Sequence, residues 1–263
     1  MSTQTMAAGS RSLGRIYTLE AKSELLKLLR LPMYAVPTIA FPMVFYLLFG
    51  VAMGGRSAGG VSYATYLMVS YGAFGVVGAS LFGFGVGLAV ERGQGWMLFK
   101  RATPMPPLVH LAGRLTVCLL FSAAVVLGLF ALGAALAGVR LPAAAWLTLV
   151  PVLLSGALAF GAFGLAIGYW VGPNSAPAVV NVIYLPVAFA SGMWFPIQAM
   201  PRFVQELAPF LPSYHYTQLA LKVIGADLGG AVATHVAALV GFTVVSLFLA
   251  RAGFRRDEGR TFG

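Results

Sequence analysis

The side chains that could carry catalysis are few in this sequence and lie far apart. It contains seven carboxylates, three histidines and one cysteine. His110, His215 and His235 are well separated and Cys118 lies inside an apolar run, so no group of residues has metal-ligand spacing. The Walker A motif, Gly-x-x-x-x-Gly-Lys-Ser/Thr, does not occur, so the sequence holds no P-loop for ATP. We therefore predict no catalytic residue, no metal site and no cofactor on this chain.

The carboxylates also argue against a proton-coupled transporter, which needs an ionisable group at mid-membrane depth. Glu91 is placed at a membrane boundary. Four carboxylates are placed in the terminal segments, namely Glu20, Glu24, Asp257 and Glu258, and two in one loop, namely Glu206 and Asp227. A carrier that binds sodium with backbone carbonyls would escape this test. An ion-gradient-driven carrier or a channel acting alone therefore stays an alternative, as does the membrane part of a sensor.

The elements that position these residues are expected to be membrane helices. Hydrophobic residues make up 59% and charged residues 9% of the chain, whereas a soluble domain carries about 25% charged residues. A bilayer core needs about 20 apolar residues per helix. The runs of that length predict spans over residues 33–54, 63–90, 108–138, 143–171, 176–195 and 231–250. The expected fold is an all-α membrane protein, with a disordered tail at residues 1–10 and a single transmembrane domain over residues 11–263.

The basic residues predict the orientation. With both termini in the cytoplasm, four of the 17 Lys and Arg residues lie outside, namely Arg56, Arg140, Arg202 and Lys222, and the others lie inside. The positive-inside rule favours this arrangement. Membrane flanks thus account for the net charge of +10, and we predict no nucleic-acid partner.

Residues 11–30 precede the first span. Ile16, Leu19, Leu26 and Leu29 recur at helical spacing, with cations between them. This pattern predicts an amphipathic helix lying in the membrane interface. A helix packed on a cytoplasmic partner has the same pattern, and the two interpretations are compatible.

The segment ERGQGWMLFKRATPMPP, residues 91–107, follows the second span. Gly93 and Gly95 allow the chain to turn, and WMLFKRA can form about two helical turns with aromatic and cationic side chains. Three prolines then end the helix. The order of these features predicts a short helix lying across the cytoplasmic face; the alternative is an ordinary basic loop with interfacial aromatics.

A second unusual segment, Ser191 to Leu228, follows the fifth span. It is too apolar for a simple loop, and four prolines divide it: Pro196, Pro201, Pro209 and Pro212. We expect short broken helices that dip into the outer leaflet, which is allowed where protein covers the backbone. The alternative is a loop lying on the membrane surface.

These two segments, in this order on a six-span chain, resemble the permease subunit of type-2 ATP-binding-cassette (ABC) exporters. ERGQGWMLFKRATPMP is similar to the Glu-Arg…Gly…Leu…Thr-Pro cytoplasmic segment of that family. SGMWFPIQAMPRFVQELAPFLPSYHYTQLAL is similar to its Ser-Gly…Phe-Pro…Met-Pro…Pro…Tyr segment. The resemblance covers nearly the whole chain.

The resemblance implies that the first segment is a coupling helix that contacts a separate ATPase. By position, the coupling residues are Glu91, Arg92, Trp96, Phe99, Lys100, Arg101, Thr103 and Pro104. Residues 11–30 would be the connecting helix beside it. The family further implies a homodimer of permeases in the bacterial cytoplasmic membrane, with two ATPase subunits that bind ATP and magnesium.

The resemblance also places the substrate path between protomers, with the second segment at its exit. The residues expected along it are Tyr71, Phe74, Phe82, Tyr184, Met193, Trp194 and Phe195. Such walls carry almost no charge and offer no receptor for a strongly anionic substrate. We therefore expect export of an amphipathic or hydrophobic substrate, such as a drug, an antibiotic or a lipid-like molecule. SGMWFP is closer to the drug-exporter branch, while polysaccharide or glycolipid export stays an alternative because sugar channels also use aromatics.

Overall fold

The computed structural model describes residues 13–30, 32–53, 56–96 and 106–261. Two predicted features lie outside these ranges: the tail at residues 1–10 and the middle of the coupling segment, residues 97–105.

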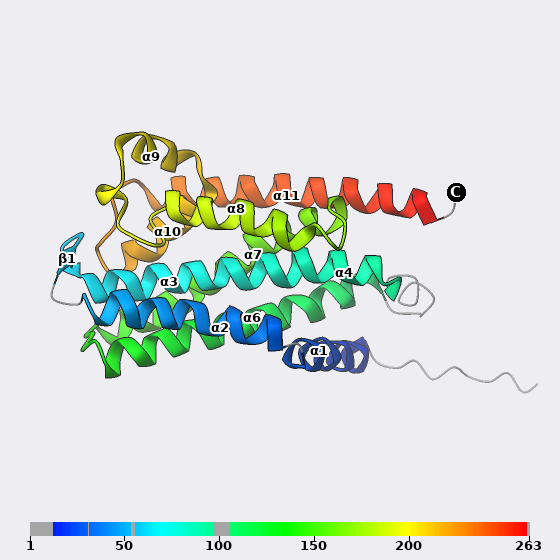
Figure 1. Cartoon of the computed structure of the whole chain (residues 1–263), viewed down its shortest axis with the longest axis horizontal. Coiled ribbons are helices and arrows are strands. Elements are labelled where there is room, and N and C mark those ends of the chain that lie inside the picture. Colours follow the sequence, from blue (N-terminus) through cyan, green and yellow to red (C-terminus); the bar gives the residue numbers. More distant parts are fainter. Residues whose placement is uncertain (1–12, 31, 54–55, 97–105, 262–263) are drawn as a thin grey trace, which may run out of the picture.

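Six apolar helical segments run side by side along the long axis of the molecule (Figure 1). Within the described chain, four helices are long and apolar enough to cross a membrane: Tyr63–Gly93, Leu108–Ala135, Ala143–Trp170 and Val232–Asp257. They belong to α3 (Tyr63–Ser80) continued by η2 (Leu81–Val86) and α4 (Gly87–Gly93), to α6 (Pro107–Ala135), to α7 (Ala143–Trp170) and to α11 (Val232–Thr261). Two shorter apolar helices are α2 (Pro32–Phe45) with η1 (Tyr46–Val51), and α8 (Ala176–Ala190). Each predicted span therefore corresponds to an apolar helical segment, and four of the six have full spanning length.

The two ends of this bundle differ. One end carries both α1 (Leu13–Leu29) and the C-terminal end of α11, on opposite sides of the bundle, and we call this the α1 end (Figure 1). The opposite end carries the two-stranded hairpin of β1 (Ser57–Ala58) and β2 (Val61–Ser62), and we call it the hairpin end. Both described ends of the chain thus lie at the same end of the molecule, as an even number of crossings requires.

The α1 helix packs on α6 through polar side chains and through Leu25 and Leu28, which contact the cluster that holds Val117 and Phe121. Tyr17 Oη lies 2.6 Å from Thr116 Oγ1, and Gly113 of α6 allows close approach to Ala21. The predicted apolar stripe faces away from the bundle, because Leu19, Leu26 and Leu29 are exposed. An outward apolar face suits a helix that lies in lipid.

The segment after α8 is broken at its prolines. It forms η3 (Ile197–Ala199), α9 (Arg202–Leu207), η4 (Ala208–Phe210) and α10 (Pro212–Val223). Pro196 and Pro201 directly precede η3 and α9, and Pro209 and Pro212 lie at the starts of η4 and α10. A proline is favoured there because its missing N–H would be unpaired in any case. The prediction of short broken helices is confirmed.

The core of the bundle is α3, in which every residue is buried. Two glycines of α7 bring its backbone against η2 and α4. A Cβ at Gly164 would lie 3.0 Å from the Ser80 carbonyl oxygen, and one at Gly168 would lie 3.0 Å from the Gly85 carbonyl oxygen. Gly164, Gly168 and Gly172 recur every four residues on one face of the sequence pattern, which is typical of close helix packing in membranes. The first two make such contacts, whereas Gly172 faces open space.

Candidate coupling site and substrate path

Glu91 lies in α4, where the second span ends, and it joins three helices. Its buried carboxylate contacts the ammonium of Lys27 in α1 and the guanidinium of Arg114 in α6. Glu24 of α1 binds the same Lys27 at 2.6 Å and lies 3.8 Å from Arg114. Charges from α1, α4 and α6 therefore meet in one buried group.

Two further side chains complete this group. His110 Nδ1 lies 2.7 Å from a carboxylate oxygen of Glu20, and His110 Nε2 lies 3.8 Å from Glu91. We call the whole set the ionic cluster: Glu20, Glu24, Lys27, Glu91, His110 and Arg114. Glu20, Glu24 and His110 converge closely enough to hold a metal ion. However, Lys27 and Arg114 already neutralise the neighbouring carboxylates, so the arrangement is that of an ion-pair network.

Arg114 extends the ionic cluster into the second span. Its Nη1 donates to the Gly83 carbonyl at 3.3 Å, and Gly83 lies in the π-helical turn η2. Arg114 is only 4% exposed. Removing one partner of a buried ion pair costs about 3–5 kcal/mol, because the other charge stays buried without compensation. The contacts of Arg114 therefore hold α6 firmly to the second span.

Arg92, the next residue, binds on the other side of α4. Its guanidinium donates to Asp257 Oδ1 of α11 from Nη2 at 2.5 Å and from Nε at 3.1 Å. Its Nη1 donates to the Gly168 carbonyl of α7 at 2.6 Å, and the group lies 5.7 Å from the ring centroid of Tyr169. Arg92 thus joins α4 to α7 and α11.

The two neighbouring residues therefore connect the end of the second span to four other helices. Gly95 has φ +76, so the chain turns just after α4, and Trp96 is 57% exposed. The remaining predicted coupling residues lie outside the described residues: Phe99, Lys100, Arg101, Thr103 and Pro104. A displacement of the segment that follows Gly93 would act directly on both sets of contacts.

The predicted path residues largely come together, as a row of aromatic rings. Phe82 and Tyr184 lie 6.4 Å apart between ring centroids, and Phe74 stacks on Tyr184 at 4.7 Å. Trp194 lies 5.6 Å from Phe74. The row continues from Trp194 through Phe45 and Phe49 to Phe195 and Phe189. We call these eight side chains the aromatic row.

Two predicted path residues support this row from behind. Tyr71 and Met193 are almost completely buried. The Tyr71 hydroxyl donates to the Trp194 carbonyl at 3.4 Å, and the Tyr184 hydroxyl donates to the Phe74 carbonyl at 2.7 Å. These bonds fix Tyr71 and Tyr184 to the backbone of neighbouring members of the row, of which Phe74 and Tyr184 are buried.

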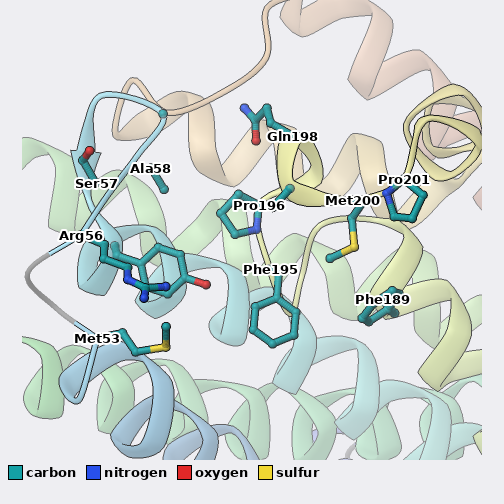
Figure 2. A pocket seen from close by; sticks show the side chains of 13 residues that line it. Met53, Arg56, Ser57, Ala58, Phe189, Phe195, Pro196, Gln198, Met200 and Pro201 are labelled. Carbon is teal, nitrogen blue, oxygen red and sulfur yellow. The ribbon is translucent and has the colours of Figure 1, made fainter.

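A cavity lies at each end of the aromatic row. The inner cavity, at the α1 end, measures about 790 Å³ and is lined by α1, η2 and α4, including Phe82. The outer cavity, at the hairpin end, measures about 860 Å³ and is lined by Phe189 and Phe195. Figure 2 shows Arg56 on one side of the outer cavity and Phe195 and Met200 on the other. Both volumes are in the range of small-molecule sites.

Comparison with known proteins assigns this arrangement to a family. Residues 17–224 match the family described as ABC-2 type transporter. The chain belongs to the ABC-2 type transporter family. It is 26% identical over 236 residues to the putative transport permease YvfS of Bacillus subtilis, which covers 90% of this chain and 96% of that protein. It is 31% identical over 130 residues to nodulation protein J of Rhizobium leguminosarum bv. trifolii, covering 46% and 49% of the two chains.

An ABC-2 permease is a multi-pass membrane subunit that works with an ABC ATPase, and the ATPase hydrolyses the ATP. This agrees with the missing Walker A motif and with the prediction that this chain is a transport subunit rather than an enzyme.

Sequence reasoning missed most of the ionic cluster, because it assigned Glu20 and Glu24 to a terminal segment without tertiary contacts, and it treated Asp257 in the same way. In the structure Glu24 is buried, at 5% exposure, and Asp257 binds Arg92. A signal was present in the spacing. Glu20 and Glu24 are four residues apart, as are His110 and Arg114, so each pair lies on one helix face. An acidic pair on one helix and a basic pair on another were available as complementary surfaces.

Proposed function

We propose that this ABC-2 permease exports an amphipathic or hydrophobic substrate, with a drug, an antibiotic or a lipid-like molecule as the expected class. The substrate leaves the cytoplasm or the inner leaflet of the bacterial cytoplasmic membrane. The transporter is a homodimer of this chain with two copies of the ATPase. Both termini lie in the cytoplasm, and the segment from Glu91 to Pro104 transmits the movements of the ATPase.

The observation that carries this proposal is the double attachment at the end of α4. Glu91 binds α1 and α6, and Arg92 binds α7 and α11. A chain without an ATP site must receive its movement from a partner. A segment that begins at such a junction can pass a push from the ATPase to both halves of the bundle, and so shift a two-state equilibrium.

The substrate class is supported by the aromatic row and its two cavities. The outer cavity is lined mainly by aromatic, methionine, proline and alanine residues. The inner cavity combines an apolar surface, to which Leu26, Phe82 and Trp96 contribute, with polar and charged side chains. An apolar or amphipathic molecule gains free energy from contact with such walls, at about 25 cal/mol for each Å² of apolar surface removed from water.

The test is reconstitution of the purified chain into proteoliposomes with and without its ATPase, over a panel of amphipathic compounds and glycolipids. We expect transport only with ATPase, magnesium and ATP, and we expect selected compounds to stimulate ATP hydrolysis. Transport by the chain alone under an ion gradient would contradict the proposal and favour a carrier. Stimulation by glycolipids or polysaccharides alone would move the substrate to the alternative class.

A further inference from the structure

The two cavities share a charge pattern. The inner cavity is lined by Glu24, Lys27 and Glu91, which are engaged in the ionic cluster, and also by Arg30. The outer cavity is lined by Arg56. Among the residues that the structure describes, no carboxylate lies within ion-pair distance of Arg30 or Arg56. Within the described ranges, each cavity therefore has one exposed guanidinium without a counter-ion, beside apolar side chains such as Phe82 or Phe195.

The aromatic row connects these two guanidinium groups. Its first ring, Phe82, lines the inner cavity, and its last rings, Phe195 and Phe189, line the outer cavity. Successive ring centroids along it lie 4.7–6.4 Å apart. The same combination of a cation and an apolar surface thus occurs at both ends of one continuous row.

Trp194, in the middle of the row, adds an independent observation. Its indole N–H is buried and has no hydrogen-bond partner in the described part of the chain. A buried donor without an acceptor costs about 1–3 kcal/mol. Such a donor is matched by a ligand that carries an acceptor oxygen along the row.

We propose that the exported substrate is an amphiphile with a single negative charge, whose headgroup binds Arg30 in the inner cavity and Arg56 in the outer cavity while its apolar part packs on the aromatic row. This inference rests on the proposed export function and names its substrate class. One guanidinium at each end favours one carboxylate, sulfate or phosphate monoester charge, because arginine binds such groups with two parallel hydrogen bonds. A cationic amphiphile is disfavoured, because the carboxylates in the inner cavity, Glu24 and Glu91, already bind Lys27 and Arg114, and no carboxylate lines the outer cavity.

The bound group is the substrate rather than a resident lipid. A lipid held at one membrane surface would need one cationic site, whereas the chain has Arg30 after α1 and Arg56 beside β1. These two elements lie at opposite ends of the molecule (Figure 1). Continuous rings between them and an unpaired donor midway serve a molecule that moves between the two positions.

The experiment measures binding by the purified chain in phosphatidylcholine nanodiscs, without ATPase. The probes are three dansylated C12 amphiphiles that differ only in the headgroup: a carboxylate, an alcohol and a trimethylammonium. Energy transfer from the four tryptophans to dansyl reports binding, with protein-free nanodiscs as the blank. We expect the carboxylate to bind about tenfold more tightly than the trimethylammonium, as one charge-assisted contact provides.

Matched variants locate the two binding positions. Arg30→Gln and Arg56→Gln are each expected to weaken carboxylate binding, and Arg56→Lys to restore part of it by keeping the charge. Lys22→Gln in α1 and Arg202→Gln in α9 remove exposed cations at the same two ends that line neither cavity, so they should bind like wild type. Equal binding of the three probes, or unchanged binding in both arginine variants, would overturn the inference.

A second arm separates this inference from the export proposal and from a resident lipid. Because no ATPase is present, charge-selective binding can be found even if ATP-driven transport fails. Conversely, ATP-driven export of all three probes at equal rates would leave the export function intact and overturn the charge preference. The lipid alternative makes two joint predictions: anionic phosphatidylglycerol in the nanodisc fully displaces the carboxylate probe, and export shows no charge preference. If both results were found, Arg30 and Arg56 would be assigned to lipid binding.

Discussion

The α1 end and the hairpin end of this permease are held together by different forces. At the α1 end, buried or partly buried ion pairs join α1, α4, α6 and α11, and Arg92 also donates to a carbonyl of α7. At the hairpin end, proline-started helices, ring contacts and neutral hydrogen bonds, for example between the Ser191 and Ser213 hydroxyls, hold the chain together with one ion pair within it, Lys222–Asp227. The predicted contact with the ATPase lies at the end built from ions.

This difference suggests a division of roles. A buried ion pair has strict geometry, and losing one partner leaves a costly uncompensated charge. Such contacts resist small distortions and transmit a displacement to all connected helices. Ring contacts and short helices change their arrangement at a smaller cost for each contact, which suits an exit that opens and closes. The following predictions test this division, from the largest expected effect to the smallest.

Glu91→Gln is expected to have the largest effect, because it removes the carboxylate that neutralises Arg114 and Lys27. We expect ATP-driven transport to fall by at least about 100-fold and the free energy of unfolding to fall by about 3 kcal/mol. Transport assays in proteoliposomes and denaturant unfolding measure both. Glu206→Gln in α9 removes an exposed carboxylate at the hairpin end and is the control.

A double-mutant cycle separates charge from shape at this position. Glu91→Gln combined with Arg114→Gln removes both charges, so its stability should recover part of the loss seen in Glu91→Gln. Additive losses in the two single variants would mean that the two side chains do not interact, contrary to the role given to the ionic cluster.

Trp96→Ala is expected to affect coupling without affecting stability. The side chain is 57% exposed, so the fold loses little, whereas an exposed aromatic at the predicted ATPase contact is a typical binding hot spot. We expect about a tenfold weaker association with the ATPase, measured by copurification or surface binding, and an unchanged unfolding midpoint. Phe210→Ala, which truncates a more exposed aromatic at the hairpin end, should leave this association unaltered.

The sequence predicted the elements better than the contacts between them. Apolar runs located all six helical segments, and the prolines of residues 191–228 located the breaks between short helices. Neither pattern specifies which polar residues meet. Glu24 reads as a tail residue because its burial depends on α6, whose His110 and Arg114 lie more than 80 residues away. The close contacts of Gly164 and Gly168 do have a sequence signal, because a small residue repeated every four positions acts through one helix face.

Gly168→Ala should produce a moderate effect at the α1 end. A Cβ there would lie 2.9 Å from Leu88 Cβ and 3.0 Å from the Gly85 carbonyl oxygen, so α7 must move away from α4. The Gly168 carbonyl also accepts from Arg92. We expect a loss of about 1–3 kcal/mol in the free energy of unfolding. Gly172→Ala, four residues further on and facing open space, is the control, and equal losses in both variants would contradict the packing argument.

The smallest expected effect is a pH response at the hairpin end, where an imidazole pair joins α10 to α11. His215 Nδ1 lies 2.8 Å from His235 Nδ1, and His215 Nε2 lies 2.9 Å from the Pro209 carbonyl oxygen. Burial lowers the pKa of His215 from its ordinary value of 6.5, and the neighbouring His235 lowers it further, whereas the bond to Pro209 opposes the shift. The other nearby side chains are the ring of Tyr214 and the Lys222–Asp227 ion pair.

The sign of the response follows from that lowered pKa. Between the folded and the unfolded pKa the unfolded chain binds more protons, so stability rises with pH across this window. The contribution of His215 to the stability of the fold is thus complete above its ordinary pKa of 6.5 and is lost as the pH falls through its lowered pKa in the folded chain.

Hydrogen exchange of α10 amides should therefore accelerate modestly between about pH 7 and about pH 5, after correction for the intrinsic exchange rate. His215→Gln cannot titrate and should flatten this dependence, while exchange in α4, at the other end, should not respond to the substitution. A pH response of α10 that is as steep in His215→Gln as in wild type would assign it to other groups.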